Sequence, residues 1–537
     1  MFGAGGGTSS YREAEDTDLV LLWGSNARET HPIFFHHLLR GARKGGRLVA
    51  VDPRRTSTAE WADLWLGIDV GSDIALANAM AREIIHSDLA DKEFIERATT
   101  GFDEYAECVD AYTLDRAETE TGVPASAIKE VAHAYGRADR AMICWTLGIT
   151  EHHNAVDNVL ALINLALLTG KVGRYGCGLN PLRGQNNVQG GGDMGAIPNR
   201  LPGFQDLEDP ALRAPFEKAW KATVPPKRGY HLSQMFESME HGEMRALYVV
   251  GENPARSEAD QTRAVRLLSG LEHLVVQDLF LTQTAELAHV VLPAAAGWAE
   301  SEGTVTSSER RVQRVRRALV PPAGARDDVE IISEIAQHLG CDWGQPTAEQ
   351  VWDECRSLSP MHAGMSYARL DELGGIQWPC PDETHPGTEF LHARLWKDPV
   401  EGPRAPFSVV EHDPPVDKLT EEFPIRLTTG RRLDSFNTGV QTGAYTSPLR
   451  QREALLLSPS DGARLGIVDG ERVLASSRRG AVEMPVRFDA TLRPGLAFLT
   501  LHFPDQVATN VLTIDATDPK SGTAEFKASA IRVDKLK

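Results

Sequence analysis

One pattern of apolar and polar residues limits the possible folds of this chain more than any other feature. An apolar run at 19–23 ends at Gly24 and Asn26. After a helical pattern, a second apolar run at 47–51 ends at Asp52. Two short apolar runs joined by an amphipathic helix predict a β-α-β unit with parallel strands. The carboxyl ends of such strands meet at one edge of the sheet, so these glycine and polar positions are expected to lie together there.

The same pattern returns later in the chain. The apolar run 247–250 ends at Gly251 and Asn253, and the run 274–276 leads to Asp278. The glycine and the aspartate are 28 positions apart in the first copy and 27 in the second. This agreement predicts two related Rossmann-like α/β lobes. Two ordinary α/β layers that match by chance are the alternative.

At 537 residues the chain is too long for a single core, so several domains are expected. The fold class that we predict is α/β, with two related Rossmann-like lobes followed by a C-terminal β-barrel. Short β-type runs separated by glycines near the C-terminus favour the barrel. The predicted boundaries are 1–182 for the first lobe, 183–326 for the second lobe, 327–417 for a proline-rich connecting segment and 418–537 for the barrel.

Charge and cysteine content exclude several classes of function. A net charge of −19, with no block of basic residues, would repel a phosphate backbone, so no nucleic acid partner is expected. The longest apolar helical stretch, 156–168, is too short and too interrupted to cross a bilayer, so no membrane span is expected. The six cysteines include no C-x-x-C pair, and no metal-ligating set is expected within this chain. Reduced thiols and the absence of a signal-like leader favour a cytoplasmic location.

Both lobes offer the side chains that a dinucleotide needs. A diphosphate binds to backbone amides and cations, and ribose or base edges bind to carboxylates and carboxamides. The candidate cofactor-binding residues are Gly24, Asn26, Asp52 and Arg54 in the first lobe, and Gly251, Asn253, Asp278 and Thr282 in the second. Because no G-x-G-x-x-G motif is present, a nicotinamide cofactor is not supported. For each residue taken alone, a capping asparagine or a solvated charge is the alternative.

A loop rich in glycine and carboxamides lies between the two lobes, at residues 180–195. Glycines let the backbone approach a flat heterocycle, and amide side chains can donate or accept there. Gln185 is a candidate for such a contact, and the rigid guanidinium of Arg183 suits a small carboxylate. Composition alone would favour a flexible linker, but the position between two nucleotide-type lobes favours a binding loop.

These motifs together resemble a known family. The segments that carry the resemblance are Leu182–Gly190 (Leu-Arg-Gly-Gln-Asn-Asn-Val-Gln-Gly), the loops Gly24–Asn26 and Val51–Arg54, Asp278 with Thr282, and Trp298–Gln313. They are similar to molybdopterin oxidoreductases of the dimethyl-sulfoxide-reductase superfamily, and within it to the catalytic (alpha) subunits of formate dehydrogenases. The similarity extends over nearly the whole chain.

The resemblance implies a cofactor and a place for each candidate residue. The implied cofactor is a molybdenum or tungsten ion held by two molybdopterin guanine dinucleotides (bis-MGD), which accounts for two half-sites. The C-terminal domain resembles the family's double-psi barrel, and its implied cofactor contacts are Thr438, Asn510 and Lys527. Arg183 matches the arginine that binds the substrate carboxylate and is the implied catalytic residue, and Gln185 would lie beside the pterin.

The resemblance also implies an activity, the oxidation of formate to carbon dioxide with electrons passing to iron–sulfur partners. A complete family member begins with a lobe that holds a 4Fe-4S cluster, followed by a cysteine or selenocysteine ligand to the metal and a catalytic histidine, and none of these is found in the sequence. The expectation is an N-terminally truncated chain that is inactive by itself and needs an iron–sulfur subunit or the missing lobe. Another oxidoreductase of the superfamily, such as a nitrate reductase, and a non-catalytic pterin-binding subunit are the alternatives.

Overall fold

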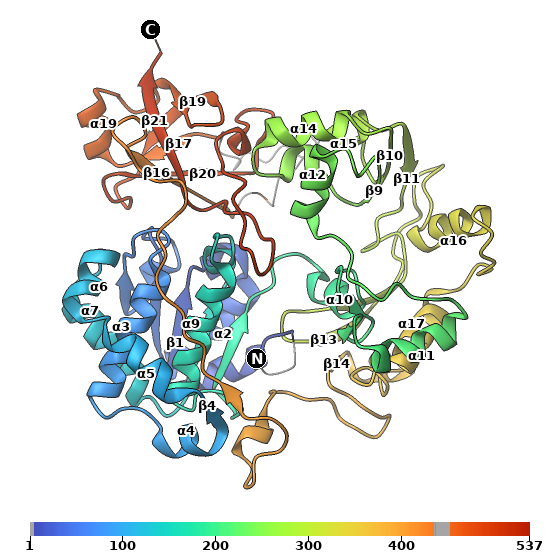
Figure 1. The fold of residues 1–537 in the computed structure, drawn as a ribbon, viewed down its shortest axis with the longest axis horizontal. Helices are drawn as coiled ribbons and strands as arrows, with labels where there is room; N and C mark the ends of the chain where they lie inside the picture. The colour runs from blue at the N-terminus through green and yellow to red at the C-terminus, as the bar shows by residue number, and fades with distance from the viewer. Residues whose placement is uncertain (1–4, 434, 436–451, 537) are drawn as a thin grey trace.

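The first lobe is a parallel sheet covered by helices on both faces. A computed structural model describes residues 5–433, 435 and 452–536 (Figure 1). In it the five strands of this sheet lie in the order β3-β2-β1-β5-β6. Every residue of β1 is buried, because Leu21 and Trp23 join the core beneath α3 and α9 while Val20 and Leu22 join the core beneath α2. A strand covered on both faces is apolar throughout, which explains the unbroken run in the sequence.

The elements of this lobe are as follows. The strands are β1 (Leu19–Trp23), β2 (Arg47–Val51), β3 (Leu64–Leu66), β4 (Thr99–Thr100), β5 (Ala141–Trp145) and β6 (Gly178–Pro181). The helices are η1 (Tyr11–Asp16), α1 (Ala27–Thr30), α2 (Pro32–Arg43), η2 (Ala59–Trp61), α3 (Asp73–His86), α4 (Lys92–Ala98), α5 (Phe102–Asp110), α6 (Leu114–Thr121), α7 (Ala125–Arg137), α8 (Leu147–Thr150) and α9 (Ala155–Leu168).

The second lobe is a smaller parallel sheet with the order β11-β10-β9. Helices α12 and α14 pack against it through one apolar core. Its first strand is largely exposed, and Tyr248 and Val250 keep 40% and 42% of their surface in solvent. The elements are α12 (Leu232–Glu240), β9 (Ala246–Val250), α13 (Pro254–Ser257), α14 (Gln261–Ser269), β10 (His273–Asp278), α15 (Gln283–Glu286) and β11 (Val290–Pro293).

The two lobes repeat each other down to single hydrogen bonds. The order β3-β2-β1 corresponds to β11-β10-β9. The amide of Gly24 donates to the carbonyl of Val51 at 2.8 Å, and the amide of Gly251 donates to the carbonyl of Gln277 at 2.8 Å. A second pair of equivalent bonds follows: the amide of Asp63 donates to the carbonyl of Leu48, and the amide of His289 donates to the carbonyl of Leu274, both at 2.8 Å. The predicted pair of related Rossmann-like lobes is therefore confirmed.

A third region joins distant parts of the chain. Strands β12 (Gly303–Thr306) and β13 (Arg311–Val315) pair with β14 (Ile376–Gln377), and β15 (Ala405–Pro406) pairs with β4 in the first lobe. The segment 327–417, predicted to be a proline-rich connecting segment, contains three α-helices and contributes β14 to this sheet. Eight of its ten prolines lie at 379 or beyond, whereas the α-helices end by 373. The other elements here are α10 (Val188–Asp193), β7 (Arg200–Leu201), β8 (Gln205–Asp206), α11 (Pro210–Trp220), α16 (Asp328–His338), α17 (Ala348–Leu358), α18 (Tyr367–Leu373) and η3 (Ala393–Trp396).

The C-terminal domain is a closed barrel of six strands, in the order β16-β20-β17-β19-β18-β21, which confirms the predicted barrel. Alternate residues of its strands fill one apolar interior, as is usual for a small barrel. Its elements are β16 (Ile425–Gly430), β17 (Leu455–Leu457), α19 (Pro459–Leu465), β18 (Arg472–Ser476), β19 (Ala481–Phe488), β20 (Leu496–Thr500), η4 (Thr509–Val511) and β21 (Ser529–Lys535).

The barrel lies beside both lobes, and the chain that leads to it runs along the first lobe past α9 (Figure 1). That chain is fixed to the first lobe by buried amides. Asn78 donates to the carbonyl of Val410 at 2.9 Å, and Asn164 donates to the carbonyl of Ser408 at 2.7 Å. Among the helices that the structure describes, none combines the length and apolarity needed to cross a bilayer.

Candidate functional site

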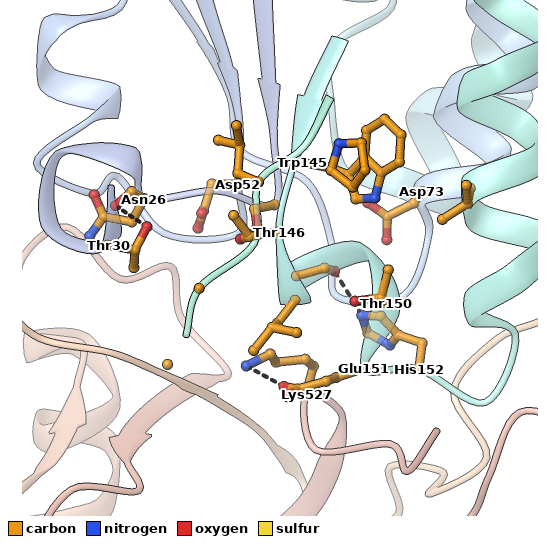
Figure 2. A pocket seen from close by; sticks show the side chains of 18 of the residues that line it. Asn26, Thr30, Asp52, Asp73, Trp145, Thr146, Thr150, Glu151, His152 and Lys527 are labelled. Carbon is orange, nitrogen blue, oxygen red and sulfur yellow. Dashed lines mark hydrogen bonds and ion pairs between the residues drawn. The ribbon is translucent and has the colours of Figure 1, made fainter. Parts of the chain in front are cut away.

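A cavity of about 580 Å³ lies between the first lobe and the barrel (Figure 2). The loops that follow β1, β2, β5 and β6 form one wall, and β16 together with the segment before β21 contributes the opposite wall. The carboxyl edge of a parallel sheet is the usual ligand position in this kind of fold. The candidate residues that line the cavity are Gly24, Asn26, Asp52, Arg54, Arg183, Gln185 and Lys527.

Two glycines let the loops after β1 and β5 cross at this edge. Gly24 has a φ of +58°, and a Cβ built on it would lie 2.8 Å from the carbonyl carbon of Gly148. A Cβ on Gly148 would lie 2.5 Å from the carbonyl oxygen of Gly24. Neither position has room for a side chain, so the crossing exposes backbone at the cavity wall.

The asparagine that follows each glycine fixes the neighbouring loop. Oδ1 of Asn26 accepts from the amide of Thr58 at 3.3 Å and from its hydroxyl at 2.8 Å. Oδ1 of Asn253 accepts from the amide and hydroxyl of Thr284 at 3.1 and 2.8 Å. In both lobes the side chain therefore joins the loop after the first strand to the loop after the second. Asn26 also lines the cavity.

The loop after β2 provides a cation and a carboxylate. The guanidinium carbon of Arg54 lies 3.5 Å from the ring centre of Phe498 in the barrel, so this cation lies across the junction between the two domains. A carboxylate oxygen of Asp52 accepts from the amide of Arg54 at 2.9 Å. Burial raises the pKa of Asp52 to about 6, although the charge of Arg54 acts in the opposite direction.

Lys527 brings a second cation from the barrel. Its Nζ lies 2.7 Å from Glu151 and donates to the carbonyl of Thr429 at 3.1 Å (Figure 2). The pair is nearly enclosed, with side-chain exposures of 11% for Lys527 and 15% for Glu151. The ammonium group is therefore held in place at the cavity wall.

Arg183 enters the cavity from the glycine-rich loop. Its Nε donates to Oε1 of Gln189 and its Nη2 donates to the carbonyl of Gly5, both at 3.1 Å. Its Nη1 makes no hydrogen bond with any described residue. The backbone carbonyl of Arg183 is 2.8 Å from Nε2 of His31, which fixes the loop. Two of the three nitrogens thus orient the guanidinium, and one edge remains available to a ligand.

The loop after β5 was not singled out from the sequence. Trp145, Thr146, Glu151 and His152 all line the cavity (Figure 2). Thr146 donates to the carbonyl of Gly24 at 2.6 Å, which fastens the crossing of the two loops. A signal was present, because the apolar run at 141–145 is followed directly by a threonine and two positions later by a glycine. His31, Asp73 and His392 are further lining residues that were missed.

The sequence models of two families match this chain. The one described as "Molybdopterin oxidoreductase" matches residues 4–338, more than half of the chain, and the one described as "Molydopterin dinucleotide binding domain" matches 425–530. The chain belongs to the molybdopterin oxidoreductase family.

Relatives of this oxidoreductase include formate dehydrogenase subunits. It is 40% identical to F420-dependent formate dehydrogenase 2 subunit alpha of Methanococcus maripaludis, over 100% of this chain and 79% of that protein. It is 37% identical to formate dehydrogenase H of Escherichia coli, over 99% of this chain and 75% of that protein. Among solved structures, acetylene hydratase from Pelobacter acetylenicus has the same fold, with a TM-score of 0.75 at 20% identity over 100% of this chain and 80% of that one.

The residues around the cavity of this oxidoreductase fit a molybdopterin dinucleotide. The cofactor carries a diphosphate, and the lining includes the cations Arg54, Arg183, Arg431 and Lys527 in a chain whose net charge is −19. The backbone exposed by the glycine crossing and the carboxylate of Asp52 supply donors and an acceptor for the nucleotide end. In the described part of the chain, no three His, Cys, Asp or Glu side chains are grouped so that they could hold a metal ion.

The other predicted contacts are not part of this cavity. Gly251, Asn253, Asp278 and Thr282 lie together at the carboxyl edge of the second sheet, and Asn510 joins that lobe to the barrel by donating to the carbonyls of Arg256 and Ser257 at 3.0 and 3.1 Å. Thr282 caps α15 by accepting from the amide of Ala285 at 3.2 Å. At the position equivalent to Arg54 the second lobe has Phe280. Thr438 lies outside the described residues.

Proposed function

We propose that this molybdopterin oxidoreductase is the catalytic (alpha) subunit of a formate dehydrogenase. The observation that carries the proposal is the orientation of Arg183, whose guanidinium is fixed through Nε and Nη2 and leaves Nη1 without a described partner in the cavity. A planar guanidinium edge binds a carboxylate by two parallel charge-assisted hydrogen bonds. The identity of 40% to a formate dehydrogenase alpha subunit supports the same substrate.

The proposed reaction converts formate into carbon dioxide, one proton and two electrons. When bound, the cofactor would supply a molybdenum or tungsten centre able to accept the two electrons. Arg183 holds the carboxylate oxygens and so directs the C–H bond of formate to one side. His31 keeps the loop of Arg183 in place through its contact with the backbone carbonyl. Holding a small substrate in the reactive orientation lowers the activation barrier, because the entropy of ordering it has already been lost on binding.

We also propose two guanine dinucleotides, one for each lobe. Gly24, Asn26, Asp52, Arg54, Gln185 and Lys527 would bind the first, and Gly251, Asn253, Asp278, Thr282, Thr438 and Asn510 would bind the second. Asp52 suits the amino and imino groups of a guanine or the hydroxyls of a ribose. Electrons would leave through an iron–sulfur partner, and the protein would work in the cytoplasm.

The test uses the holoenzyme purified from its own host with the polypeptides that copurify. Viologen-linked oxidation of formate is expected, and reduction of nitrate without oxidation of formate would overturn the proposal. Replacing Arg183 by Ala should raise the KM for formate by roughly tenfold or more, since a hydrogen-bonded charge is lost. The matched control is Arg200→Ala, because Arg200 pairs with Asp206 at 2.9 Å and does not line the cavity.

A further inference from the structure

A buried carboxylate lies behind Arg183 and takes no part in the function proposed so far. Asp193, the last residue of α10, is 1% exposed. Its Oδ1 accepts from Nε2 of Gln189 at 2.8 Å, and its Oδ2 accepts from the indole of Trp378 at 2.8 Å. The described residues offer it no direct salt bridge. Burying a carboxylate that is paired only with neutral donors destabilises the fold, which suggests that its charge serves a function.

The hydrogen bonds around Gln189 have a fixed direction. Its Nε2 donates both to Asp193 and to the carbonyl of Gly5, at 2.8 and 3.1 Å; the carbonyl can only accept, and so can the carboxylate while it is ionised. The amide oxygen of Gln189 must then face Arg183, whose Nε can only donate. The ionised carboxylate of Asp193 and the carbonyl of Gly5 together hold the amide in the orientation that meets the arginine.

We propose that Asp193 is a positioning residue which, through Gln189, fixes the guanidinium of Arg183 and thereby sets the affinity for the carboxylate substrate. The inference rests on the proposed function for the identity of that substrate. Asp193 does not contact Arg183 directly, and its effect is transmitted through the side chain of Gln189. Its effect is expected in substrate binding more than in the turnover of bound substrate.

Protonation of Asp193 would weaken this arrangement. A neutral carboxylic acid is a poorer acceptor for Nε2 of Gln189 than a carboxylate, and its O–H could donate to the amide oxygen only if Gln189 turned over and gave up its bonds to Gly5 and Arg183. Either change leaves the guanidinium of Arg183 less firmly held. Burial raises the pKa of Asp193 to about 6, while the hydrogen bonds from Gln189 and Trp378 and the charges of Arg183 and Arg310 act in the opposite direction. Those two arginines are the charged groups that face it, and formate itself stays ionised at this pH.

The first experiment measures kcat and KM for formate in the holoenzyme between pH 5 and 8. In the parent enzyme KM should rise below about pH 6, because the folded carboxylate is ionised only above its pKa. Asp193→Asn should raise KM roughly tenfold, leave kcat within about threefold and lose the acid limb of the KM profile. The matched control is Asp206→Asn in the β7–β8 hairpin, where KM and its pH dependence should not change. An unchanged KM in Asp193→Asn overturns the inference while the proposed function stands.

A second variant tests the same network without touching the carboxylate. Trp378→Phe removes the indole donor, which helps to keep Asp193 ionised. The rise of KM at acid pH should therefore begin at a higher pH in this variant. A limb that stays in place, or moves to lower pH, contradicts the inference. This variant also decides the case if Asp193→Asn fails to fold.

A readout independent of formate separates the two proposals. Labelling of Arg183 by phenylglyoxal, followed by peptide mass spectrometry, reports how freely the guanidinium moves. Arg183 should react several-fold faster in Asp193→Asn than in the parent or in Asp206→Asn. If the parent enzyme does not oxidise formate, the proposed function fails, and the labelling rates alone decide whether Asp193 positions Arg183.

Discussion

The two lobes share one backbone design but differ in what surrounds it. In the first lobe β1 lies between β2 and β5, and all of its residues are buried. In the second lobe β9 pairs only with β10 among the described strands, and most of its residues are exposed or half-buried. The loop-fixing asparagines, Asn26 and Asn253, are nevertheless bonded in the same way. The local hydrogen bonds therefore do not depend on the outer strands, whereas the burial of the sheet does.

The lobes also differ in charge at equivalent positions. Arg54 follows Asp52 by two residues and contacts the barrel, and Phe280 occupies the same place after Asp278. In the second lobe, burial and the neighbouring carboxylate of Glu252 raise the pKa of Glu258 to about 7, and burial raises the pKa of Asp278. The sheet edge of the first lobe therefore carries a cation, whereas the equivalent edge of the second lobe is acidic and apolar. The first edge is better suited to a diphosphate.

The largest effect is expected from removing the cation that distinguishes the lobes. Arg54→Ala should lower the pterin and metal content of the purified holoenzyme roughly tenfold or more, because the proposed charge-assisted contact to the diphosphate would be lost. Phe280→Ala should leave the content within about twofold. Arg55→Ala serves as the local control, since this exposed neighbour does not line the cavity. Equal losses in Arg54→Ala and Phe280→Ala would show that the charge difference between the lobes does not matter.

A smaller effect, equal in the two lobes, is expected at the asparagines. Asn26→Ala and Asn253→Ala each leave a threonine amide and hydroxyl without their acceptor, which should cost about 2 kcal/mol locally. Hydrogen exchange at the amides of Thr58 and Thr284 measures this loss, and Asn26→Asp, which keeps an accepting oxygen, is the control. A loss confined to one lobe would mean that the shared hydrogen bonds are not equivalent in energy.

The smallest effect concerns two contacts of the barrel, one with each lobe, that differ in kind. The barrel also forms ion pairs with the second lobe, Arg256–Asp505 at 2.8 Å and Arg263–Asp515 at 3.2 Å, and these are left unchanged in the comparison. Glu525 is fully buried and lies 3.0 Å from Nδ1 of His153 in the first lobe, whereas Asn510 holds the second lobe through neutral amide bonds. Burial alone would raise the pKa of Glu525, but hydrogen bonds from His152 and His153 outweigh it and lower the pKa to about 2. The hydrogen bond with Glu525 raises the pKa of His153.

The sign of the pH dependence follows from these shifts. A lowered carboxylate pKa gives stability that is present above about 4.5 and is lost as the pH falls towards 2. A raised histidine pKa gives stability that is present below about 6.5 and is lost as the pH rises through the folded pKa. Glu525→Gln should therefore destabilise by about 1 kcal/mol at pH 5.5 and by less at pH 8.5, as measured by thermal unfolding. Asn510→Ala should show the same loss at both values, and a pH-independent loss in Glu525→Gln would rule out the ionic contribution.

The position of the first cavity wall can be predicted from the sequence because that wall is local. Gly24 and Asp52 directly follow an apolar strand, and Asn26 comes two residues after Gly24, so their place at the sheet edge depends only on the strand pattern. The opposite wall depends on tertiary contacts. Lys527 reaches the cavity only because the barrel docks there, and a match to a known family, not a pattern of spacing, singled it out.

Other parts could not be predicted for identifiable reasons. Residues 188–193 form α10 although they include three consecutive glycines, which disfavour a helix, and the buried contacts of Gln189 and Asp193 explain why the helix forms. The segment with Arg183 resembled a flexible linker by composition, and only its partners show that it is fixed. The repeat predicted that Gly251, Asn253 and Asp278 follow the strands at the edge of the second sheet, but it could not reveal the different charge around them.

The crossing of Gly24 and Gly148 has a consequence for how this protein can change over generations. Any single-base change that alters the amino acid of a glycine codon introduces a residue with a β-carbon, and at either position that carbon would collide with backbone, which cannot step aside as a side chain can. One mutation cannot compensate for the other, because each collision is with main chain. Both positions are therefore expected to remain glycine, because no single amino-acid replacement at either one fits the crossing.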